Sequence, residues 1–445
     1  MPAVTAPHEQ TLRAIDRDTG RRTEILLLCQ LFYPELVSTG QTLTELAEEL
    51  VASGVDVEVV CGPPTIVAAD RRLPRNMVHN GIRIHRVWGT RFPKLSFLGR
   101  VINQLTFTCS VFLHLLVHHS RKPILVLTNP PFLAVTCALL KVLRLGGAYI
   151  FLIFDVYPDT AIRLGVLKEQ GVVARLWERV NRFVFRHASA IVVIGRCMYE
   201  VIRRKAAHLR CPLNGELRAI HMWSDDRNIA SAKGGENPLV DRFGTRGKFV
   251  VEYSGNMGRF HDMETIMEAA ERLKDIDDIV FLFVGEGHKK AWMMHFAAEK
   301  GLRNCQFHTY VPREELGQLL ALGDLGLVSL VDGQEGLSVP SKSFGIMAAG
   351  RPIVAVMSPA SEIARIIAEE ECGAVVRPGD SQALADSILA FHQNRAVCEL
   401  AGERSARAIR ARYNLHDAAK EYRSLIEELC SQCIAGRDEM EGNDL

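Results

Sequence analysis

The chain has 445 residues and predicts two or three domains, since one domain commonly spans about 100–200 residues. Hydrophobic residues make up 48% and charged residues 24%, the range of ordinary globular proteins, which excludes a mainly disordered, collagen-like or coiled-coil chain. The 53 Lys and Arg residues nearly balance the 52 Asp and Glu residues, so the overall charge argues against a dedicated nucleic-acid-binding protein.

The 11 cysteines are scattered among apolar neighbours, which indicates reduced thiols in a cytosolic protein rather than a disulfide framework. Cys430 and Cys433 form a lone CxxC pair, for which we expect no metal or redox role. Residues 1–22 are polar and lack the apolar stretch of a signal peptide, so we expect a disordered leader there. Polar residues, prolines and glycines interrupt the apolar stretches 101–117 and 124–154, so we expect neither to span a membrane.

The charges are distributed unevenly along the chain. Residues 71–154 contain no Asp or Glu but twelve Lys and Arg residues, so the rest of the chain carries −11 against a total of +1. The middle of this window, residues 91–122, combines cations with aromatic and aliphatic residues in a helical pattern, as in segments that lie on an anionic bilayer. We therefore expect residues 71–154 to contact an anionic membrane surface. The alternative is that the apolar residues are core and the cations face solvent.

Continuous apolar runs of strand length alternate with helical patterns along most of the chain. Strands that are apolar at every position indicate a parallel sheet covered by helices on both faces. After the first run, a loop through Gly40 leads to an amphipathic helix over 41–53. The expected strands are 25–31, 55–61, 124–128, 148–154 and 190–194 in the first half, and 249–253, 279–284, 306–310, 325–330, 353–356 and 374–376 in the second.

The pattern predicts an α/β fold of two Rossmann-like, doubly wound domains whose strands point their carboxyl ends at a central cleft. A segment rich in Asp, Asn, Gly and Lys separates the two sets of strands, and we interpret it as the linker. A long helix of about 408–430 has no strand after it, so we expect it to pack back on the first domain. The expected order is a leader (1–22), an N-terminal domain (23–224), a linker (225–248), a C-terminal domain (249–405), a C-terminal helix (406–432) and a tail (433–445).

Glycine-containing loops follow several strands. The segments 38–40, 254–258 and 285–287, with the helix start at 340–342, would point backbone amides at a shared site. Glycines let a backbone approach a phosphate, and helix N-termini carry partial positive charge, so together these loops predict a diphosphate site. The chain has neither a GxGxxG after the first strand nor a GxxxxGK[ST], which disfavours a dinucleotide oxidoreductase and a P-loop ATPase.

These residues resemble glycosyltransferase family 4, whose members have the GT-B fold. The resemblance rests on six segments in the family's order along nearly the whole chain. They are FYPE at 32–35, YSGNMG at 253–258, FVGEG at 283–287, YVPREEL at 310–316, the strand at 325–330 and PSKSFGIMAAGRP at 340–352. Within the family, DVYPDTAIRLG at 155–165, HMWSD at 221–225 and the PSK sequence are similar to the fucosyl- and fucosaminyltransferases of bacterial colanic acid and O-antigen synthesis.

The resemblance implies a retaining sugar transfer from a nucleotide-sugar donor, with neither metal nor other cofactor, to a lipid-linked saccharide on the inner face of the cell membrane. It also implies that residues 23–224 form the acceptor domain and residues 249–405 the nucleotide-sugar-binding domain. It implies catalytic roles for Asp155, His261 and Lys342, of which His261 and Lys342 would offset the charge of the leaving diphosphate. Asp159 is a further acid near the expected cleft. The implied donor-binding residues are Gly40, Phe154, Gly255, Asn256, Gly258, Arg259, Gly285, Glu286, Val311, Glu335 and Ser341.

Two departures from the family pattern affect the sugar site. Where the family has two Glu residues eight positions apart, the aligned residues are Leu337 and Gly345, so the usual carboxylate is absent or displaced to Glu335. Where the family has a His that binds the 6-hydroxyl of the donor, this chain has Phe154. Phe cannot form that hydrogen bond, so we expect a 6-deoxy sugar; the alternative is that Phe154 packs in the core.

Two other function classes stay open at this point. A nucleotide-sugar epimerase shares the two-domain architecture, but it needs carboxylates and His converging on the sugar, and the sequence offers no such cluster. A catalytically inert GT-B binding subunit is consistent with the loss of both Glu residues.

Overall fold

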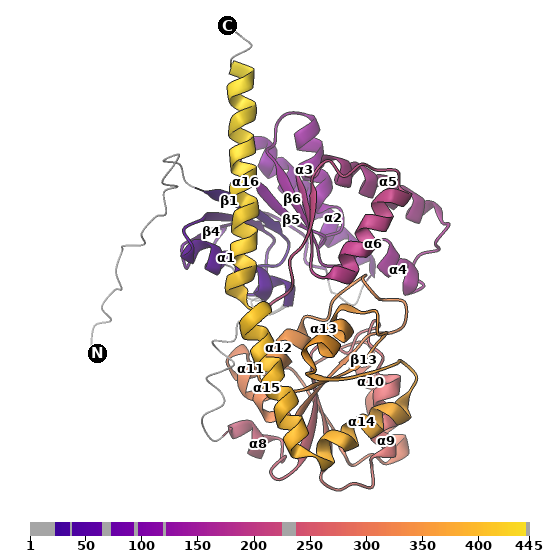
Figure 1. Ribbon diagram of the computed structural model, residues 1–445. Helices are drawn as coiled ribbons and strands as arrows, with labels where there is room; N and C mark the ends of the chain where they lie inside the picture. Colours follow the sequence, from indigo (N-terminus) through magenta and orange to yellow (C-terminus); the bar gives the residue numbers. More distant parts are fainter. Residues whose placement is uncertain are drawn as a thin grey trace, which may run out of the picture. The chain divides into compact units, whose positions relative to one another are not determined.

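The computed structural model describes residues 23–35, 38–64, 73–92, 97–118, 122–224 and 237–441, without the side chains of 38, 97 and 432–441. The expected leader, the first half of the expected linker and four of the window's twelve cations, Arg71, Arg72, Lys94 and Arg121, lie outside these ranges. Strands and helices alternate through most of the chain and build two sheets (Figure 1). The chain divides into two compact units, Met1–Phe151 with Ala419–Leu445, and Leu152–Ala418.

The first sheet has eight strands in the order β3-β4-β2-β1-β5-β6-β7-β8. Its apolar strands were predicted to within two residues at each end, because they are buried on both faces. The strands are β1 (Glu24–Cys29), β2 (Asp56–Cys61), β3 (Asn76–His79), β4 (Ile82–Arg86), β5 (Ile124–Leu127), β6 (Tyr149–Ile153), β7 (Ala190–Val193) and β8 (Glu216–Ala219). The helices are α1 (Ser38–Ala52), α2 (Phe97–His118), α3 (Leu133–Val142), α4 (Asp159–Arg163), α5 (Val172–His187) and α6 (Arg196–His208).

The basic window contains a hairpin that the apolar pattern does not predict. β3 and β4 pair antiparallel around Asn80 and Gly81, which both have positive φ. Arg83 pairs with Asp56 and Glu58, and Lys122 with Glu24 and Glu58, which lie outside the window. These two cations are therefore neutralised within the first unit.

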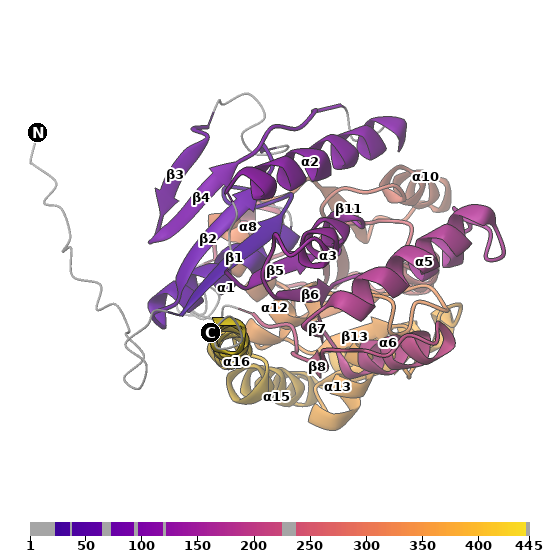
Figure 2. The ribbon, with the colours of Figure 1, turned by 90° about the horizontal axis from the view of Figure 1, so that it is seen from above.

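Helix α2 carries large apolar side chains on its exposed face as well as on its buried face. Phe107, Val111 and Leu115 are buried, and the helix lies beside α3 (Figure 2). The outer face exposes 67% of Leu98, 51% of Leu105, 60% of Leu113 and 73% of Val117. Contrary to the expectation from sequence, Leu98–His118 is by length and composition apolar enough to cross a membrane, and 17% of its 18-residue apolar window is buried.

The second sheet has six parallel strands in the order β11-β10-β9-β12-β13-β14. They are β9 (Phe249–Ser254), β10 (Ile279–Val284), β11 (Cys305–His308), β12 (Leu325–Ser329), β13 (Ile353–Val356) and β14 (Gly373–Val376). The helices around them are α8 (Pro238–Arg242), α9 (Glu264–Arg272), α10 (Lys290–Lys300), the 3-10 helix η2 (Arg313–Glu315), α11 (Leu316–Leu322), α12 (Lys342–Ala348), α13 (Glu362–Glu370) and α14 (Ser381–Gln393).

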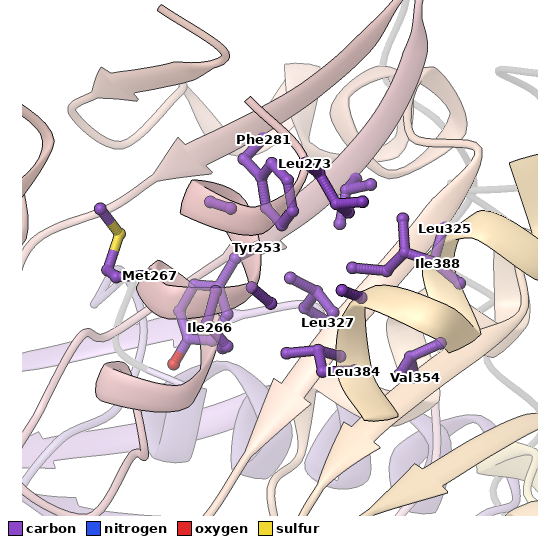
Figure 3. Packing of buried hydrophobic residues seen from close by; sticks show 14 of the residues in the cluster. Tyr253, Ile266, Met267, Leu273, Phe281, Leu325, Leu327, Val354, Leu384 and Ile388 are labelled. Carbon is purple, nitrogen blue, oxygen red and sulfur yellow. The ribbon is translucent and has the colours of Figure 1, made fainter. Parts of the chain in front are cut away.

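One face of this sheet is closed by α9 and α14. Side chains of five strands pack against those of helices that include α9, α10 and α14 to form a single apolar core, in which Tyr253 is fully buried (Figure 3). Burial of large apolar side chains is the main stabilising contribution of such a core. The core fixes the carboxyl end of β9, from which the glycine loop at 254–258 emerges.

The C-terminal segment differs from the single helix expected at 408–430. Two helices occur, α15 (Arg395–Arg412) and α16 (Leu415–Glu441), and the second continues through much of the expected tail. Asn414 separates them, and its side-chain oxygen accepts a hydrogen bond from the amide of Asp417 at 2.8 Å. From Ala419 onward α16 belongs to the first unit, where Arg423 donates to the Ser53 carbonyl at 2.6 Å.

The division between the units does not fall at the expected linker. Leu152–Ala418 forms one unit because the segments after β6 and β7 bond to loops of the second sheet. Val156 donates to the Leu337 carbonyl at 2.9 Å, and the carboxylate of Glu362 accepts from Arg196 and from the Cys197 amide at 2.8 and 2.9 Å. Residues 237–248 of the expected linker contain α8 rather than an extended segment.

The described cysteines are free thiols, as the sequence suggested. Most are buried, and burial raises the pKa of thiols such as Cys137 and Cys197 to about 12. Cys109 differs, since it lies exposed on the outer face of α2.

Candidate functional site

The loop after β9 is held in place by polar contacts around Tyr253. The Tyr253 hydroxyl donates to the Asn256 carbonyl at 3.1 Å, and His261 Nδ1 lies 3.1 Å from both oxygens. Gly255 has φ +126°, a conformation that side chains rarely adopt. The side chains of Asn256 and Arg259 are exposed, and Arg259 forms no ion pair or hydrogen bond with another described residue.

The second glycine loop packs against the first. A Cβ on Gly285 would come within van der Waals overlap of the Gly255 carbonyl, and one on Gly287 would meet the Met257 backbone at 2.4 Å. The amides of Gly255 and Gly285 donate to Val284 and His308. The expectation that these two amides face a phosphate is therefore wrong. Gly255 is required for its positive φ, and Gly285 and Gly287 are required for the close approach of the two loops.

Lys342 begins α12, and its side chain lies against β9. Its Nζ is shielded from solvent, lies 3.3 Å from the centroid of the Tyr253 ring, and has no hydrogen-bond partner among the described residues. A Cβ on Gly255 would be 3.9 Å from this nitrogen. Burial lowers the pKa of Lys342 to about 7, although Glu252 opposes the change. The predicted cation therefore lies beside the first glycine loop, and a nearby anion would stabilise its charge.

Glu252 is a buried acid that the sequence analysis missed. It is 1% exposed, its Oε1 has no hydrogen-bond partner among the described residues, and burial raises its pKa to about 8, with Lys342 and Ser254 acting in the opposite direction. A carboxylate within the otherwise apolar strand β9 was the available signal, because Glu is rarely fully buried unless paired.

His261 does not carry the charge expected of it. Burial, together with the nearby ammonium groups of Lys342 and Lys289, lowers its pKa well below 6.5. The ring is therefore neutral at pH 7. Its hydrogen bonds to the loop make it a positioning residue for Asn256 rather than a cation.

Asp155 follows β6 and reaches the loop between β12 and α12. Asp155 and Ser338 form an isolated antiparallel bridge, and burial raises the pKa of Asp155 to about 6. The same 331–338 loop bonds to the first glycine loop, because Val331 donates to the Phe260 carbonyl at 2.8 Å. The backbone thus connects Asp155, the glycine loop and Lys342 through one short segment. Phe154, next to Asp155, is half-buried.

The carboxylate of Asp159 is paired with a lysine away from the glycine loops. Asp159 begins α4, and its carboxylate accepts from the buried Lys205 at 2.5 Å, as does that of Glu178. This ion-paired cluster is structural, so Asp159 is not one of the acids available to a substrate.

The remaining predicted residues are distributed around these loops. Glu335 is half-buried and has no partner among the described residues, whereas Glu286 is paired with Lys290 at 2.8 Å. Val311 packs partly buried against a small core cluster. Ser341 precedes α12 but does not cap it with a side-chain hydrogen bond.

At the two positions that lack the family's Glu, Leu337 is buried, with its carbonyl bonded to Val156, and Gly345 lies within α12. Gly40 belongs to the first unit and lies in the first turn of α1, which starts at Ser38 rather than at 41. A Cβ on Gly40 would meet that of Glu35 at 3.3 Å, so this position is tightly packed against the preceding loop.

Two protein-family models match the chain in succession. The "Glycosyl transferase 4-like domain" matches residues 39–209, and "Glycosyl transferases group 1" matches residues 248–394. The two matches together cover most strands of both sheets and every predicted site residue, which fits a single two-domain enzyme.

Individual relatives agree with these matches. The chain is 32% identical to the protein named as glycosyltransferase WbjE of Pseudomonas aeruginosa, over 70% of this chain and 75% of that protein. It is 28% identical to the protein named as the colanic acid biosynthesis glycosyl transferase WcaI of Escherichia coli K12, over 75% of this chain and 83% of that one. Its fold resembles that of Anabaena HepE in complex with UDP-glucose, with a TM-score of 0.67 at 15% identity over 92% and 99% of the two chains. The chain therefore belongs to glycosyltransferase family 4, and it is a glycosyltransferase with the GT-B fold.

Proposed function

We propose that this enzyme transfers a sugar, with retention of configuration and without a metal or other cofactor, from a nucleotide-sugar donor to a lipid-linked glycan. The WcaI relative is named for polysaccharide biosynthesis, and the HepE structure contains a nucleotide sugar, which supports this class of reaction and donor. The epimerase and inert-subunit alternatives have no comparable support, because the relatives are named as glycosyltransferases.

The observation that carries the proposal is the unpartnered ammonium of Lys342. A buried cation without a hydrogen-bond partner is unfavourable in the empty protein, and an anion would relieve that cost. A diphosphate bound at the first glycine loop would supply two negative groups within reach of Nζ, because that nitrogen lies beside Gly255. The exposed Arg259 guanidinium would add a second cation to the same loop.

In the proposed step, the bond between the anomeric carbon and the diphosphate oxygen breaks while the acceptor oxygen bonds to the same face of that carbon. The acceptor hydroxyl proton passes to the leaving phosphate oxygen. Lys342 stabilises the charge that develops on the diphosphate, which is the role that a metal ion has in other glycosyl transfers. Asp155 and Glu335 accept hydrogen bonds from hydroxyl groups of the donor or acceptor.

A thermal-shift screen of nucleoside diphosphates and nucleotide sugars tests the donor site, because a ligand that binds only the folded state raises its melting temperature. We expect at least one nucleoside diphosphate to stabilise the wild type, and Lys342→Met to abolish most of that shift. Lys274→Met, at an exposed lysine after α9, is the matched control and should keep it. Equal shifts in wild type and Lys342→Met would refute the site.

The donor sugar is proposed to be a 6-deoxyhexose or a 6-deoxyaminohexose. Phe154 supports this choice because its ring favours a methyl group and leaves a hydroxyl without a hydrogen bond. Donor pairs that differ only at carbon 6 should differ by about 20-fold in kcat/KM in favour of the deoxy sugar, and Phe154→His should reduce that preference. A hydroxylated donor preferred by both proteins would exclude this assignment.

The acceptor is proposed to be presented at the inner face of the cell membrane, with residues 71–154 of the enzyme on the anionic surface. The outer face of α2 supports this, since its leucines are exposed while its inner face is fixed in the first unit by Phe107 and Val111. A helix with one face in a protein core is suited to lie in the interface rather than to cross the bilayer. Arg91 and Arg100 are exposed cations close to its start.

A further inference from the structure

The loop between β12 and α12 contains a buried amide that is not used by the fold. Gln334 is 1% exposed, and neither its Oε1 nor its Nε2 has a hydrogen-bond partner among the described residues. A buried amide without partners opposes the conformation that contains it, because it has lost its hydrogen bonds to water. A side chain with both atoms in this state calls for a functional explanation.

The position of the 331–338 loop suggests a role for the side-chain amide of Gln334. A Cβ on Gly333 would lie 3.4 Å from Cδ of Arg163 in α4, and one on Gly336 would lie 2.7 Å from the Cys197 carbonyl oxygen of α6. Two residues further on, Ser338 bridges to Asp155. Gln334 therefore belongs to the segment shared with Asp155 and Glu335, at the sugar end of the proposed site rather than at the diphosphate end marked by Lys342.

The backbone on both sides of Gln334 has glycine-specific conformations. Gly333 and Gly336 have φ values of +79° and +71°, so the dipeptide Gln334-Glu335 is flanked by residues that change conformation more easily than others. A change at these positions would release the amide from its enclosed position. That change becomes favourable when a ligand satisfies the amide, because the ligand then binds one state of the loop better than the other.

We propose that Gln334 is a specificity-determining residue that turns outward on donor binding and hydrogen-bonds a polar substituent of the donor sugar, either a hydroxyl or an acylamino group. This rests on the proposed donor site. A primary amide donates and accepts at once, which matches both kinds of substituent and does not match a methyl group. The sugar is thus recognised through an apolar contact at Phe154 and a polar contact at Gln334.

The test compares the thermal shifts caused by a nucleoside diphosphate and by the corresponding nucleotide sugar in wild type and in Gln334→Leu. We expect the empty variant to melt at or above the wild-type temperature, because an unsatisfied amide has been removed. The shift with the nucleoside diphosphate should stay unchanged. The additional shift caused by the sugar should be lost, with affinity for the nucleotide sugar about five- to tenfold weaker. Gln393→Leu, at an exposed residue, is the control and should bind both ligands as the wild type does.

Donors that carry a hydroxyl or an acetamido group at the same carbon separate the two kinds of substituent, since only the recognised one should lose affinity in Gln334→Leu. If Gln334→Leu melts at a lower temperature than the wild type but keeps the additional shift caused by the sugar, the proposal is overturned and Gln334 is a structural residue. If Gln334→Leu folds poorly, Gln334→Asn retains the amide on a side chain shorter by one methylene and should lose the same increment. If neither ligand raises the melting temperature of the wild type, the proposed donor site itself is wrong. That outcome differs from one in which Gln334→Leu keeps the additional shift caused by the sugar.

Discussion

The ammonium nitrogen of Lys342 lies 3.3 Å from the centre of the Tyr253 ring, so a cation at a helix start faces an aromatic side chain at the end of a strand. The contact offers attraction from the ring but no hydrogen bond. It holds the nitrogen beside Gly255 while leaving its donors unused. The charge state of Lys342 should therefore control how the enzyme binds an anionic ligand.

The first prediction is that affinity for a nucleoside diphosphate falls as pH rises above about 7, where Lys342 loses its proton in the empty enzyme. The charged form binds the anion, so affinity should be constant below this pKa and fall by at most about tenfold per pH unit above it. Glu252 titrates nearby, and its ionised form favours the ammonium, so Glu252→Gln should move the fall to lower pH. Isothermal titration from pH 6 to pH 9 measures both effects.

Lys342→Arg provides the control for this prediction, because a guanidinium stays charged over the whole range. Its affinity should be independent of pH, whatever its absolute value. If the affinity of the wild type does not change with pH, the charge of Lys342 does not control binding. If Lys342→Arg shows the same pH dependence as the wild type, another group causes that dependence.

The second prediction concerns Asp155, whose pKa burial raises to about 6. Its ionised form is disfavoured in the folded protein, so Asp155→Asn should increase the free energy of unfolding at pH 7–8. The gain should disappear below the unfolded pKa of about 4, where the carboxyl is protonated in both states. Transfer activity should fall in the same variant, since Asp155 is proposed to contact the substrates.

Asp159→Asn is the matched comparison and should have the opposite sign. Its carboxylate is bonded to the buried Lys205, so its removal should destabilise the protein at pH 7. Denaturant unfolding at pH 4 and pH 8 distinguishes the two variants. Destabilisation by Asp155→Asn at pH 8 would contradict the assignment of Asp155 as an acid held at a cost to stability.

The third prediction concerns Glu362, which joins α13 to the start of α6. Its side chain is 1% exposed and bonds to Arg196 and the Cys197 amide, and these bonds outweigh burial and lower its pKa. Glu362→Ala should destabilise the protein by about 1–3 kcal/mol, since it leaves the buried Cys197 amide without its acceptor. Glu369→Ala, which removes the exposed partner of the same arginine, should cost less than about 1 kcal/mol. Similar losses in equilibrium unfolding of the two variants would contradict this account.

The fourth prediction concerns the membrane surface. Leu105→Ser with Leu113→Ser should weaken binding to vesicles containing phosphatidylglycerol by about tenfold or more, because two exposed leucines can no longer be buried in lipid. Leu400→Ser, at a 48% exposed leucine of α15, should have no effect. Binding should also weaken as salt rises. Equal co-sedimentation of all three proteins, or equal binding to neutral and anionic vesicles, would rule out the proposed contact.

The strands were the most predictable part of the fold. β10 and β13 were predicted at their observed bounds, because their residues are apolar at every position. The hairpin of β3 and β4 was missed, although Asn80-Gly81 is a common hairpin turn, because its strands are short and polar. The break between α15 and α16 at Asn414 was also missed, since its capping hydrogen bond is evident only from three-dimensional structure.

The site was predicted only in part. Lys342 and the first glycine loop do lie together, and the resemblance indicated both. The neutral His261 and the bonded amides of Gly255 and Gly285 depend on contacts that no local pattern contains. The pair of Arg196 and Glu362, distant in the sequence, is a property of the folded chain alone.

Cys109 gives the enzyme a native attachment point for a spectroscopic reporter. Among the described thiols it is the one classed as exposed, and the buried thiols have raised pKa values that suppress the reactive thiolate. A maleimide dye of environment-sensitive emission should therefore label this position before the other described thiols. Because Cys109 lies on the outer face of α2 among exposed leucines, the emission maximum of that dye would record the depth at which the helix rests in a lipid surface, in an enzyme whose sequence has not been changed.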